Sequence, residues 1–181
     1  AKAVSNEPFV VILPDDVIVA EKGTTTQLLE VFHQYQASVI AVEEVLGPNI
    51  QNYGAIVPEF VSEGLYKVHG TVEKPAPDQA PSRLGIVGRY VLTPEIFDAL
   101  ERVKPGALGE FQLTDAIALL LPTQKVYAYR FPGMHFDVGT PIGLLKASVY
   151  AALHREELTD ELLEWIDGVL RSRREGPAQS A

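Results

Sequence analysis

The chain has 181 residues, of which 46% are hydrophobic, and it contains no cysteine. This length fits one domain with a substantial core, and the absence of thiols excludes a disulfide framework and a thiolate metal site. The net charge of −9 disfavours non-specific binding to nucleic acid, and no apolar run approaches the ~20 residues that span a bilayer. With no signal peptide expected before the first strand, we predict a soluble cytoplasmic protein.

The first predicted element is a strand at Phe9–Leu13, where five apolar residues follow one another. Because this run is apolar on both faces, we expect a buried, central parallel strand. Pro14 ends the strand, and Asp15 and Asp16 lie just past its carboxyl end, where open α/β sheets bind ligands. Two interpretations stay open for this stretch alone: a cation site, or a turn with one capping and one solvent-facing carboxylate.

A βαβ unit is predicted next. Thr24 and Gln27 are spaced as a capping box at the start of a helix that ends near Gln36, and the pattern at 37–42 predicts a second buried strand. The two strands should therefore be parallel, with a right-handed crossover. Further along, the expected strands are 53–58 and 65–69, which form a hairpin, then 84–92 and 126–131.

Four more helices are predicted. Thr93 and Pro94 suit the N-cap and first position of a helix that runs to about Val103. The other helices are expected at 112–121, 140–153 and from 159, with a glycine-bearing loop at 104–109 and a frayed tail from 171.

Polar residues recur at strand ends or in glycine-bearing loops, and each group alone is a weak signal. The groups are Asp15-Asp16, Tyr53-Gly54, Glu73-Lys74-Pro75 and Asp137-Val138-Gly139. Asp137 is more simply interpreted as the start of a turn. For Glu73 and Lys74 an exposed ion pair stays open as an alternative, and for Gly54 a position that only permits a bend in the backbone. The four histidines show no ligand spacing, and only His135 adjoins a candidate group.

The missing motifs narrow the chemistry. The chain has no cysteine nucleophile, no Gly-x-Ser-x-Gly elbow and no His-Glu-x-x-His. Carboxylates for a hard cation and a lysine for a phosphate remain, and Mg²⁺ is typically held by one or two carboxylates plus substrate phosphates. A phosphoryl or nucleotidyl transfer needs little else, because a phosphate oxygen is already ionised and positioning and charge neutralisation carry the catalysis.

Six motifs in order resemble the bacterial UTP–glucose-1-phosphate uridylyltransferase family. They are Leu-Pro-Asp-Asp-Val-Ile (13–18), Tyr-Gly-Ala-Ile-Val (53–57), Val-Glu-Lys-Pro-Ala-Pro (72–77), Val-Gly-Arg-Tyr-Val-Leu-Thr-Pro-Glu-Ile-Phe (87–97), Gly-Glu-Phe-Gln-Leu-Thr-Asp-Ala (109–116) and Phe-Asp-Val-Gly-Thr (136–140). The resemblance runs from about Glu7 to Leu153. It implies a Rossmann-like nucleotidyltransferase fold, with a mixed sheet flanked by helices, and a reaction of UTP with glucose 1-phosphate that gives UDP-glucose and pyrophosphate.

The resemblance also implies residue roles. Asp15 and Asp137 match the metal-binding aspartates and would share one Mg²⁺, with Lys74 as the third catalytic residue, at the sugar phosphate. The implied substrate-binding set is Asp16, Gly54, Glu73, Lys74, Gly88, Glu110 and Gln112. In this set Gly54 would meet the sugar through its backbone, and Glu73 would accept hydrogen bonds from glucose hydroxyls.

The family pattern also has a glycine-rich nucleotide loop before the residues seen here. We therefore expect an N-terminally truncated domain, 1–155, with the sugar-phosphate and metal half, followed by a C-terminal helix and tail, 156–181. Little activity is expected from this chain alone. The alternatives are a non-catalytic fragment, a sugar-phosphate-binding or assembly module, or a thymidylyl or other sugar-nucleotide pyrophosphorylase. An exposed apolar edge at Phe9–Leu13 predicts a homo-oligomer or dependence on the missing segment, unless the last helix covers that edge.

Overall fold

A computed structural model of the protein describes residues 4–106 and 109–175. Its chain divides after His135 into two compact units, here called unit 1 (up to His135) and unit 2 (from Phe136).

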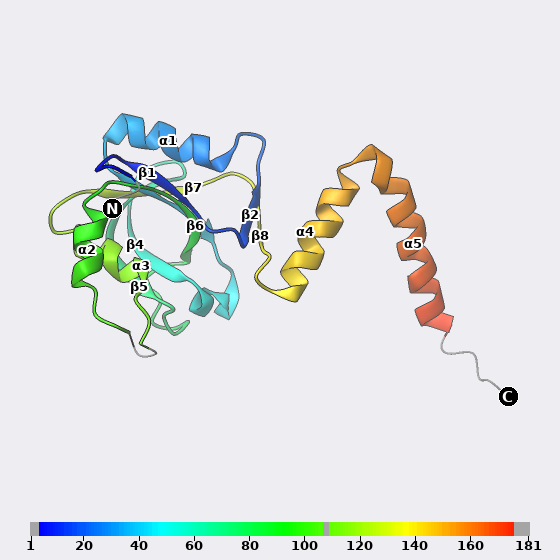
Figure 1. Cartoon of the computed structure of the whole chain (residues 1–181). Coiled ribbons are helices and arrows are strands. Elements are labelled where there is room, and N and C mark those ends of the chain that lie inside the picture. The colour runs from blue at the N-terminus through cyan, green and yellow to red at the C-terminus, as the bar shows by residue number, and fades with distance from the viewer. Residues whose placement is uncertain (1–3, 107–108, 176–181) are drawn as a thin grey trace. The chain divides into compact units, whose positions relative to one another are not determined.

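Unit 1 is built on a six-stranded mixed sheet with the order β1-β6-β3-β7-β5-β4 (Figure 1). Within it β3 and β7 run parallel, and the other neighbours run antiparallel. Its strands are β1 (Phe9–Ile12), β3 (Ser38–Glu44), β4 (Gly54–Ser62), β5 (Leu65–Glu73), β6 (Leu84–Leu92) and β7 (Val126–Arg130). In addition, β2 (Asp16–Val19) pairs with β8 (Met134–Asp137), the strand in which unit 1 ends.

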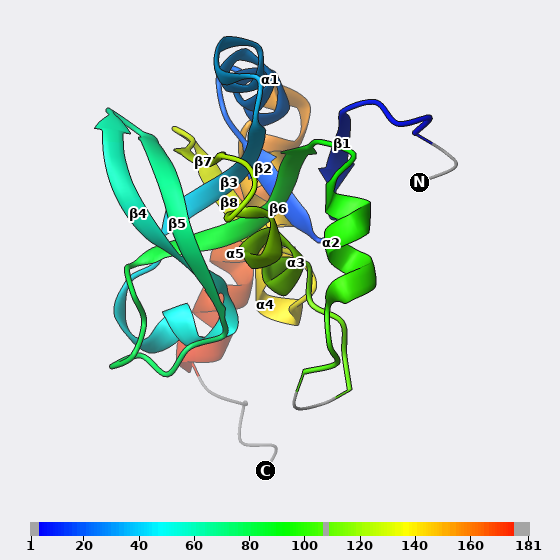
Figure 2. The ribbon, with the colours of Figure 1, turned by 90° about the vertical axis from the view of Figure 1, so that its left-hand side faces the viewer.

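Helices cover both faces of this sheet. The helix α1 (Thr24–Tyr35) lies on one face, whereas α2 (Ile96–Arg102) and α3 (Leu113–Leu120) lie on the other (Figure 2). Two apolar clusters result, one around Ile40 and Ile117 on the α2–α3 side and one around Leu28 and Val39 on the α1 side. A short 3₁₀ helix, η1 (Gly47–Asn52), joins β3 to β4. This architecture confirms the predicted mixed sheet flanked by helices.

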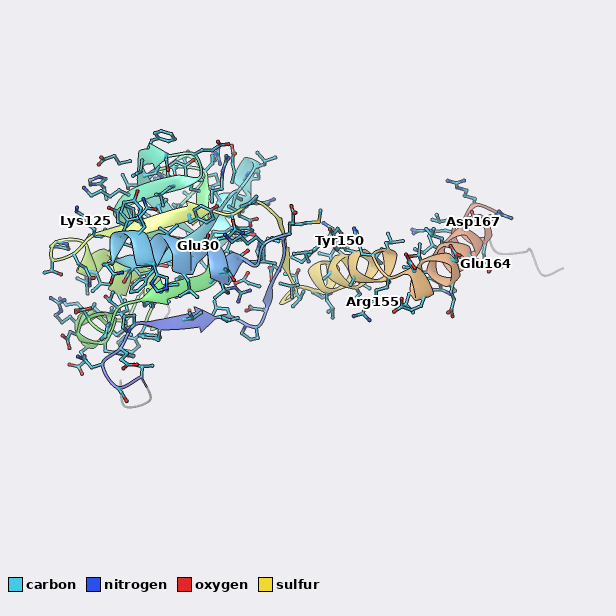
Figure 3. The ribbon with its side chains drawn as sticks, turned by 90° about the horizontal axis from the view of Figure 1, so that it is seen from above. Glu30, Lys125, Tyr150, Arg155, Glu164 and Asp167 are labelled. Atoms are coloured by element: carbon cyan, nitrogen blue, oxygen red, sulfur yellow. The ribbon has the colours of Figure 1, made fainter. Side chains whose placement is uncertain are left out.

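Unit 2 contains two helices, α4 (Pro141–Leu153) and α5 (Glu156–Glu175), which follow one another in Figure 3 and are in contact. The Thr140 side chain caps α4 by accepting a hydrogen bond from the Gly143 amide at 3.2 Å, as the Thr-Pro start predicts. The helix α5 is longer than predicted and continues through residues 171–175, where a frayed tail was expected. The rest of that tail, 176–181, lies outside the described residues. The described helices include none that is long and apolar enough to cross a membrane.

The prediction of a buried, central parallel strand at Phe9–Leu13 is wrong. The strand β1 is at the edge of the sheet, pairs antiparallel with β6, and exposes alternate residues. Val10 is 37% and Ile12 is 56% exposed. Apolarity on both faces favours a central strand only where neighbours cover both edges and faces, and within the described chain β6 covers one edge of β1.

Three local predictions also need correction. The strands β1 and β3 are parallel as expected, but they are not neighbours because β6 lies between them, antiparallel to both. The capping box fails because α1 starts with Thr24 as its first helical residue, which leaves Gly23 at the N-cap without a side-chain bond. The helix α2 starts at Ile96, after a turn, rather than at Pro94. The 104–109 loop includes residues 107–108, which are outside the described part.

Candidate functional site

Gly54, Glu73 and Lys74 come together where β4 pairs with β5. Gly54 is buried and directly opposite Glu73 in the ladder, so the first residue of β4 adjoins the last residue of β5. The Lys74 amide donates to the Tyr53 carbonyl at 3.1 Å, and its ammonium lies 3.9 Å from Glu73 Oε1. Lys74 has a φ of 43°, a left-handed conformation that is uncommon outside glycine. The register of one hairpin therefore gathers three of the predicted site residues.

Thr114 of α3 completes this group. A Cβ at Gly54 would lie 2.8 Å from the Thr114 hydroxyl and 3.2 Å from Glu73 Oε2, so only glycine leaves space between the two side chains. The Thr71 hydroxyl donates to the Thr114 carbonyl at 2.9 Å and thereby ties the start of α3 to β5. Thr114 belongs to the Gly-Glu-Phe-Gln-Leu-Thr-Asp motif, but it was not among the site residues predicted from the sequence.

A second group forms around Asp16 and Gly88. The Gly88 amide donates to Asp16 Oδ2 at 2.8 Å, and a Cβ on Gly88 would lie only 2.2 Å from that oxygen. The other carboxylate oxygen, Oδ1, lies 2.6 Å from His135 Nε2, and His135 Nδ1 lies 2.9 Å from Glu43 Oε1. Residues of β6 and β8 thus hold both carboxylate oxygens of Asp16, whose side chain is 17% exposed, and its predicted role in substrate binding stays a prediction.

His135 is an almost fully buried imidazole, with 3% of its side chain exposed. Burial works against its charged form, but the hydrogen bonds and charges of Asp16 and Glu43 outweigh this and raise the pKa of His135 to about 9. The imidazole is therefore a cation near neutral pH and bridges two carboxylates. The one signal for His135 in the sequence was its position beside a motif, and Glu43 had none.

Two more buried side chains of β6 face this region. Arg89 donates from Nη2 to the Asp16 carbonyl at 3.0 Å, and its buried Nη1 has no partner among the described residues. Burial, and then the charges of Asp16 and Glu73, raise the pKa of the Tyr90 phenol. The Tyr90 phenol therefore lies within the electrostatic influence of both Asp16 and Glu73.

Asp15 and Asp137, the predicted metal ligands, are both exposed. Asp137 Oδ1 accepts from the Gly139 amide at 3.0 Å, and the Asp137 carbonyl accepts from the Thr140 hydroxyl at 3.0 Å. The turn interpretation of Asp137 is therefore correct, and it leaves Oδ2 without a hydrogen bond to any described residue. The described ranges contain no group of three or more His, Asp or Glu side chains placed to hold a metal ion. Two carboxylates completed by substrate phosphates suit Mg²⁺ chemically, and their sharing of one ion stays a prediction.

Glu110 and Gln112 contact each other. The Gln112 amide donates to Glu110 Oε2 at 3.0 Å, and both residues precede α3. Within the described part of the chain no hydrogen bond or ion pair joins them to Gly54 or Glu73, so their predicted role in the sugar site remains a prediction. Thr114, two residues further on, is the member of this motif that reaches the group.

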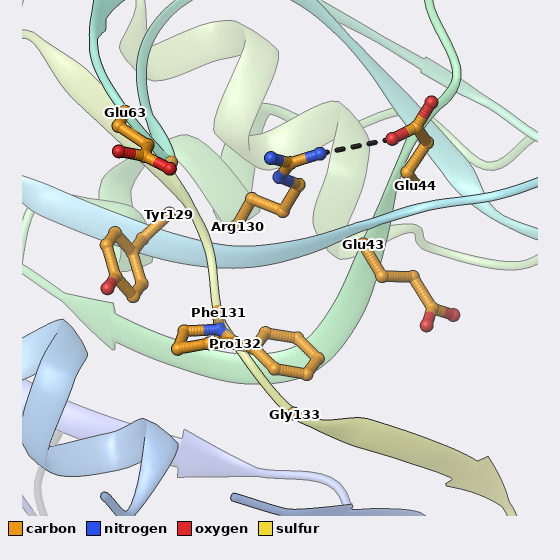
Figure 4. A pocket seen from close by; sticks show the side chains of 9 residues that line it. Glu43, Glu44, Glu63, Tyr129, Arg130, Phe131, Pro132 and Gly133 are labelled. Carbon is orange, nitrogen blue, oxygen red and sulfur yellow. Dashed lines mark hydrogen bonds and ion pairs between the residues drawn. The ribbon is translucent and has the colours of Figure 1, made fainter.

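A separate cavity of about 610 Å³ opens at the carboxyl ends of β3 and β7. Its charged lining consists of Glu43, Glu44, Glu63 and Arg130, and Arg130 is paired with Glu44 at 3.1 Å (Figure 4). Figure 4 shows Glu43 turned away from that pair, in keeping with the alternation along a strand. Three carboxylates against one already paired guanidinium do not suit a phosphate, so this cavity is not the predicted sugar-phosphate site.

The fold has relatives among solved structures. A UDP-glucose pyrophosphorylase complexed with UDP-glucose superimposes with a TM-score of 0.82 at 38% identity, covering 85% of this chain and 59% of that one. A UTP-bound enzyme of the same kind from Acinetobacter baumannii gives 0.79 at 34% identity, covering 91% and 57%. A protein described as a glucose-1-phosphate thymidylyltransferase from Bacillus anthracis, at 22% identity and a TM-score of 0.66, shares the fold alone. The fold is thus that of the solved sugar nucleotidyltransferases.

Curated sequences narrow this class. No protein-family profile matches the chain. The UTP–glucose-1-phosphate uridylyltransferase of Streptococcus pyogenes is 48% identical over 172 residues, which are 92% of this chain and 57% of that protein. The enzyme of Streptococcus pneumoniae serotype 4 is also 48% identical and is covered to 58%. The chain is a homologue of the UTP–glucose-1-phosphate uridylyltransferases, and it spans a little over half the length of the curated relatives it matches.

Proposed function

We propose that this chain carries the glucose 1-phosphate and metal-binding part of a cytoplasmic UTP–glucose-1-phosphate uridylyltransferase. The observation that carries the proposal is the grouping of Gly54, Glu73 and Lys74 with Thr114, next to Tyr90 and the Asp16–Gly88 pair. This group has what a sugar phosphate needs. The Glu73 carboxylate can accept hydrogen bonds from hydroxyls, the Lys74 ammonium carries a charge for the phosphate, and Gly54 leaves space for the ring.

The proposed reaction joins glucose 1-phosphate to the uridylyl group of UTP. A phosphate oxygen of the sugar phosphate attacks the α-phosphorus, the bond to the bridging oxygen breaks, and pyrophosphate leaves. The nucleophile is already ionised, so no residue has to remove a proton. Lys74 would offset phosphate charge, and Glu73 would orient the sugar by accepting from its hydroxyls.

Mg²⁺ would be held by Asp15 and Asp137 together with the substrate phosphates. A divalent ion there supplies charge neutralisation as the phosphates approach one another. Asp16 would not bind the ion, because its two carboxylate oxygens already meet Gly88 and His135. Its role would be to fix the backbone that carries Asp15.

A binding experiment tests the sugar site directly. Calorimetric titration of the full chain with glucose 1-phosphate should show saturable binding, and Gly54→Ala and Glu73→Gln should each weaken it at least tenfold. Gly23→Ala and Glu63→Gln are matched controls, because a Cβ at Gly23 would make only an ordinary contact at 3.7 Å and Glu63 lies outside the group. Binding that the first pair leaves unchanged would refute the site.

The alternative to this proposal is a sugar-phosphate-binding module without catalysis, and an activity measurement on these residues separates the two. We expect the 181-residue chain to form little UDP-glucose from UTP and glucose 1-phosphate. Pyrophosphate release would decide: a turnover of roughly 1 s⁻¹ or faster, the low end for ordinary enzymes, would show that these residues suffice for catalysis. Slower or absent turnover with intact sugar-phosphate binding would support the binding module.

A further inference from the structure

A second cavity of unit 1 differs in charge from the one at the ends of β3 and β7. It has a volume of about 330 Å³ and is lined by residues 67–69 of β5 and 121–125, between α3 and β7. The lining includes two lysines and a histidine, and no aspartate or glutamate. In a chain with 24 acidic and 15 basic residues, such a lining favours an anion as the ligand.

The sheet brings these basic side chains together. The strand β5 pairs antiparallel with β7, with Lys67 opposite Tyr127, and the same register continued places His69 opposite Lys125. Alternate residues of a strand point to the same side, so Lys67 and His69 share one face of β5. Lys125 is the residue before β7 (Figure 3). Two distant segments of the sequence therefore contribute basic groups to one cavity.

A carboxylate outside the lining already pairs with two of these groups. Glu59 of β4 lies 3.9 Å from the Lys67 ammonium and is hydrogen-bonded to the His69 imidazole. The hydrogen bond from His69, and then the charge of Lys67, lower the pKa of Glu59. Lys125 has no ion-pair partner in the described part of the chain. This place therefore attracts one anionic group of the protein, and Lys125 leaves a positive charge in excess.

The turn after α3 adds a hydrogen-bond donor. The side-chain oxygen of Gln124 accepts from the Thr93 hydroxyl at 3.0 Å, whereas its buried Nε2 has no partner among the residues described. A buried donor without an acceptor is unfavourable, and a ligand oxygen in the cavity would satisfy it. The Leu120 carbonyl at the end of α3 accepts from the Thr123 and Gln124 amides at 2.9 and 3.0 Å, so this helix end turns little negative charge toward the cavity.

We propose that this cavity is a binding site for a phosphate group, separate from the proposed sugar-phosphate site. Lys67 and Lys125 supply the charge, and His69 and Gln124 Nε2 supply hydrogen bonds to the phosphate oxygens. The volume is at the lower end for small-molecule pockets, so the ligand is free phosphate or the phosphate of a small ester. The site lies toward the start of β5, whereas Glu73 ends that strand, and it does not depend on the function proposed above.

The histidine rings report on this site directly. Inorganic phosphate is titrated into the Lys74→Gln variant, which removes the proposed phosphate contact of the sugar site, at fixed pH and ionic strength. The His69 ring signal in NMR spectra should shift and reach saturation, and that of His33, which is exposed on α1, should stay in place. An unchanged His69 signal, or equal shifts of both rings without saturation, would overturn the proposal.

Two charge variants with matched controls locate the phosphate. Lys125→Gln should weaken phosphate binding at least fivefold. Lys22→Gln makes the same change in net charge on an exposed lysine that pairs with Glu30 elsewhere, and it should leave the affinity as it is. Equal weakening by both variants would mean that only net charge matters and would refute the site. Circular dichroism checks the folding of each variant.

Removal of the competing carboxylate should have the opposite effect. Glu59→Gln should strengthen phosphate binding at least twofold, because it frees Lys67 and His69 and removes a like charge. Glu63→Gln is the matched control, because Glu63 lines the other cavity. Weaker or unchanged binding in Glu59→Gln would contradict the proposed position of the phosphate.

A comparison of two ligands identifies the source of the phosphate. Glycerol 3-phosphate that binds at least threefold more tightly than inorganic phosphate would identify an ester site, and the reverse order would identify a site for free phosphate. In either case Lys125→Gln should weaken the tighter ligand. If neither ligand binds, or if Lys125→Gln leaves both affinities unchanged, the cavity is not a phosphate site.

Discussion

Unit 1 and unit 2 use apolar residues in opposite ways. In unit 1 all nine residues of β6 are buried, and two clusters fill both sides of the sheet. In unit 2 the helices α4 and α5 expose most of their large apolar side chains. The contrast shows that the number of apolar residues in a segment does not tell whether those residues form a core or remain exposed. A core needs elements on both sides of an apolar layer, and the described part of unit 2 has two helices and no third.

The largest expected effect is a difference in unfolding free energy when one apolar side chain is truncated in each unit. Ile40→Ala in β3, where Ile40 is fully buried, should lower the free energy of unfolding by about 3–4 kcal/mol, because it removes apolar contacts and leaves a cavity. Leu163→Ala, at a position 49% exposed on α5, should change it by less than about 0.5 kcal/mol. Urea unfolding followed by circular dichroism measures both. Equal losses would mean that unit 2 has a core after all.

The next effect depends on pH and lies within unit 1. His135→Gln should cost about 3 kcal/mol of unfolding free energy near pH 6, because it leaves Asp16 and Glu43 without their buried cation. The pKa of His135 is raised to about 9 in the folded protein, so its stabilisation is fully present below the unfolded value of about 6.5 and is lost as the pH rises toward 9.

Urea midpoints of the original chain and the variant should therefore converge between pH 6 and pH 9.5. His33→Gln serves as the control, because His33 is exposed on α1, and it should leave the pH dependence as it is. A difference between His135→Gln and the original chain that stays constant over this range would refute the charged bridge.

The smallest expected effect distinguishes two neighbouring carboxylates. Asp16→Asn should cost about 1–3 kcal/mol, because it weakens a buried charge-assisted hydrogen bond to His135. Asp15→Asn, at an exposed position, should cost less than about 0.5 kcal/mol yet abolish Mn²⁺ binding, measured by electron paramagnetic resonance in the presence of glucose 1-phosphate. Asp137→Asn should abolish it too. Retained Mn²⁺ binding in both variants would exclude them as metal ligands.

The sequence reveals local features of the fold and site better than features made by distant residues. Apolar patterns locate the helices and most strands, and the motifs single out Gly54, Glu73 and Lys74, which one hairpin then brings together. The bridge from Asp16 through His135 to Glu43 could not be predicted, because it joins residues up to 119 positions apart with no pattern in their spacing. The burial of β1 was overestimated for a related reason: an apolar run does not say which of its faces has a neighbour.

The place of β6 in the sheet also governs the order in which the chain can fold. The strand β6 pairs with β1, β3 and β4, so none of these three can complete its pairing before its partner residues in β6 have been made. The register of Phe9 with Leu92 closes a loop of roughly 80 residues, and synthesis at about 5–20 residues per second takes roughly 4–16 s over that length. During this interval the apolar residues of β1 are not paired with β6. A ribosome that pauses between β3 and β6 would prolong the time for which the apolar residues of β1 are unpaired, so codon choice in that stretch should affect soluble yield.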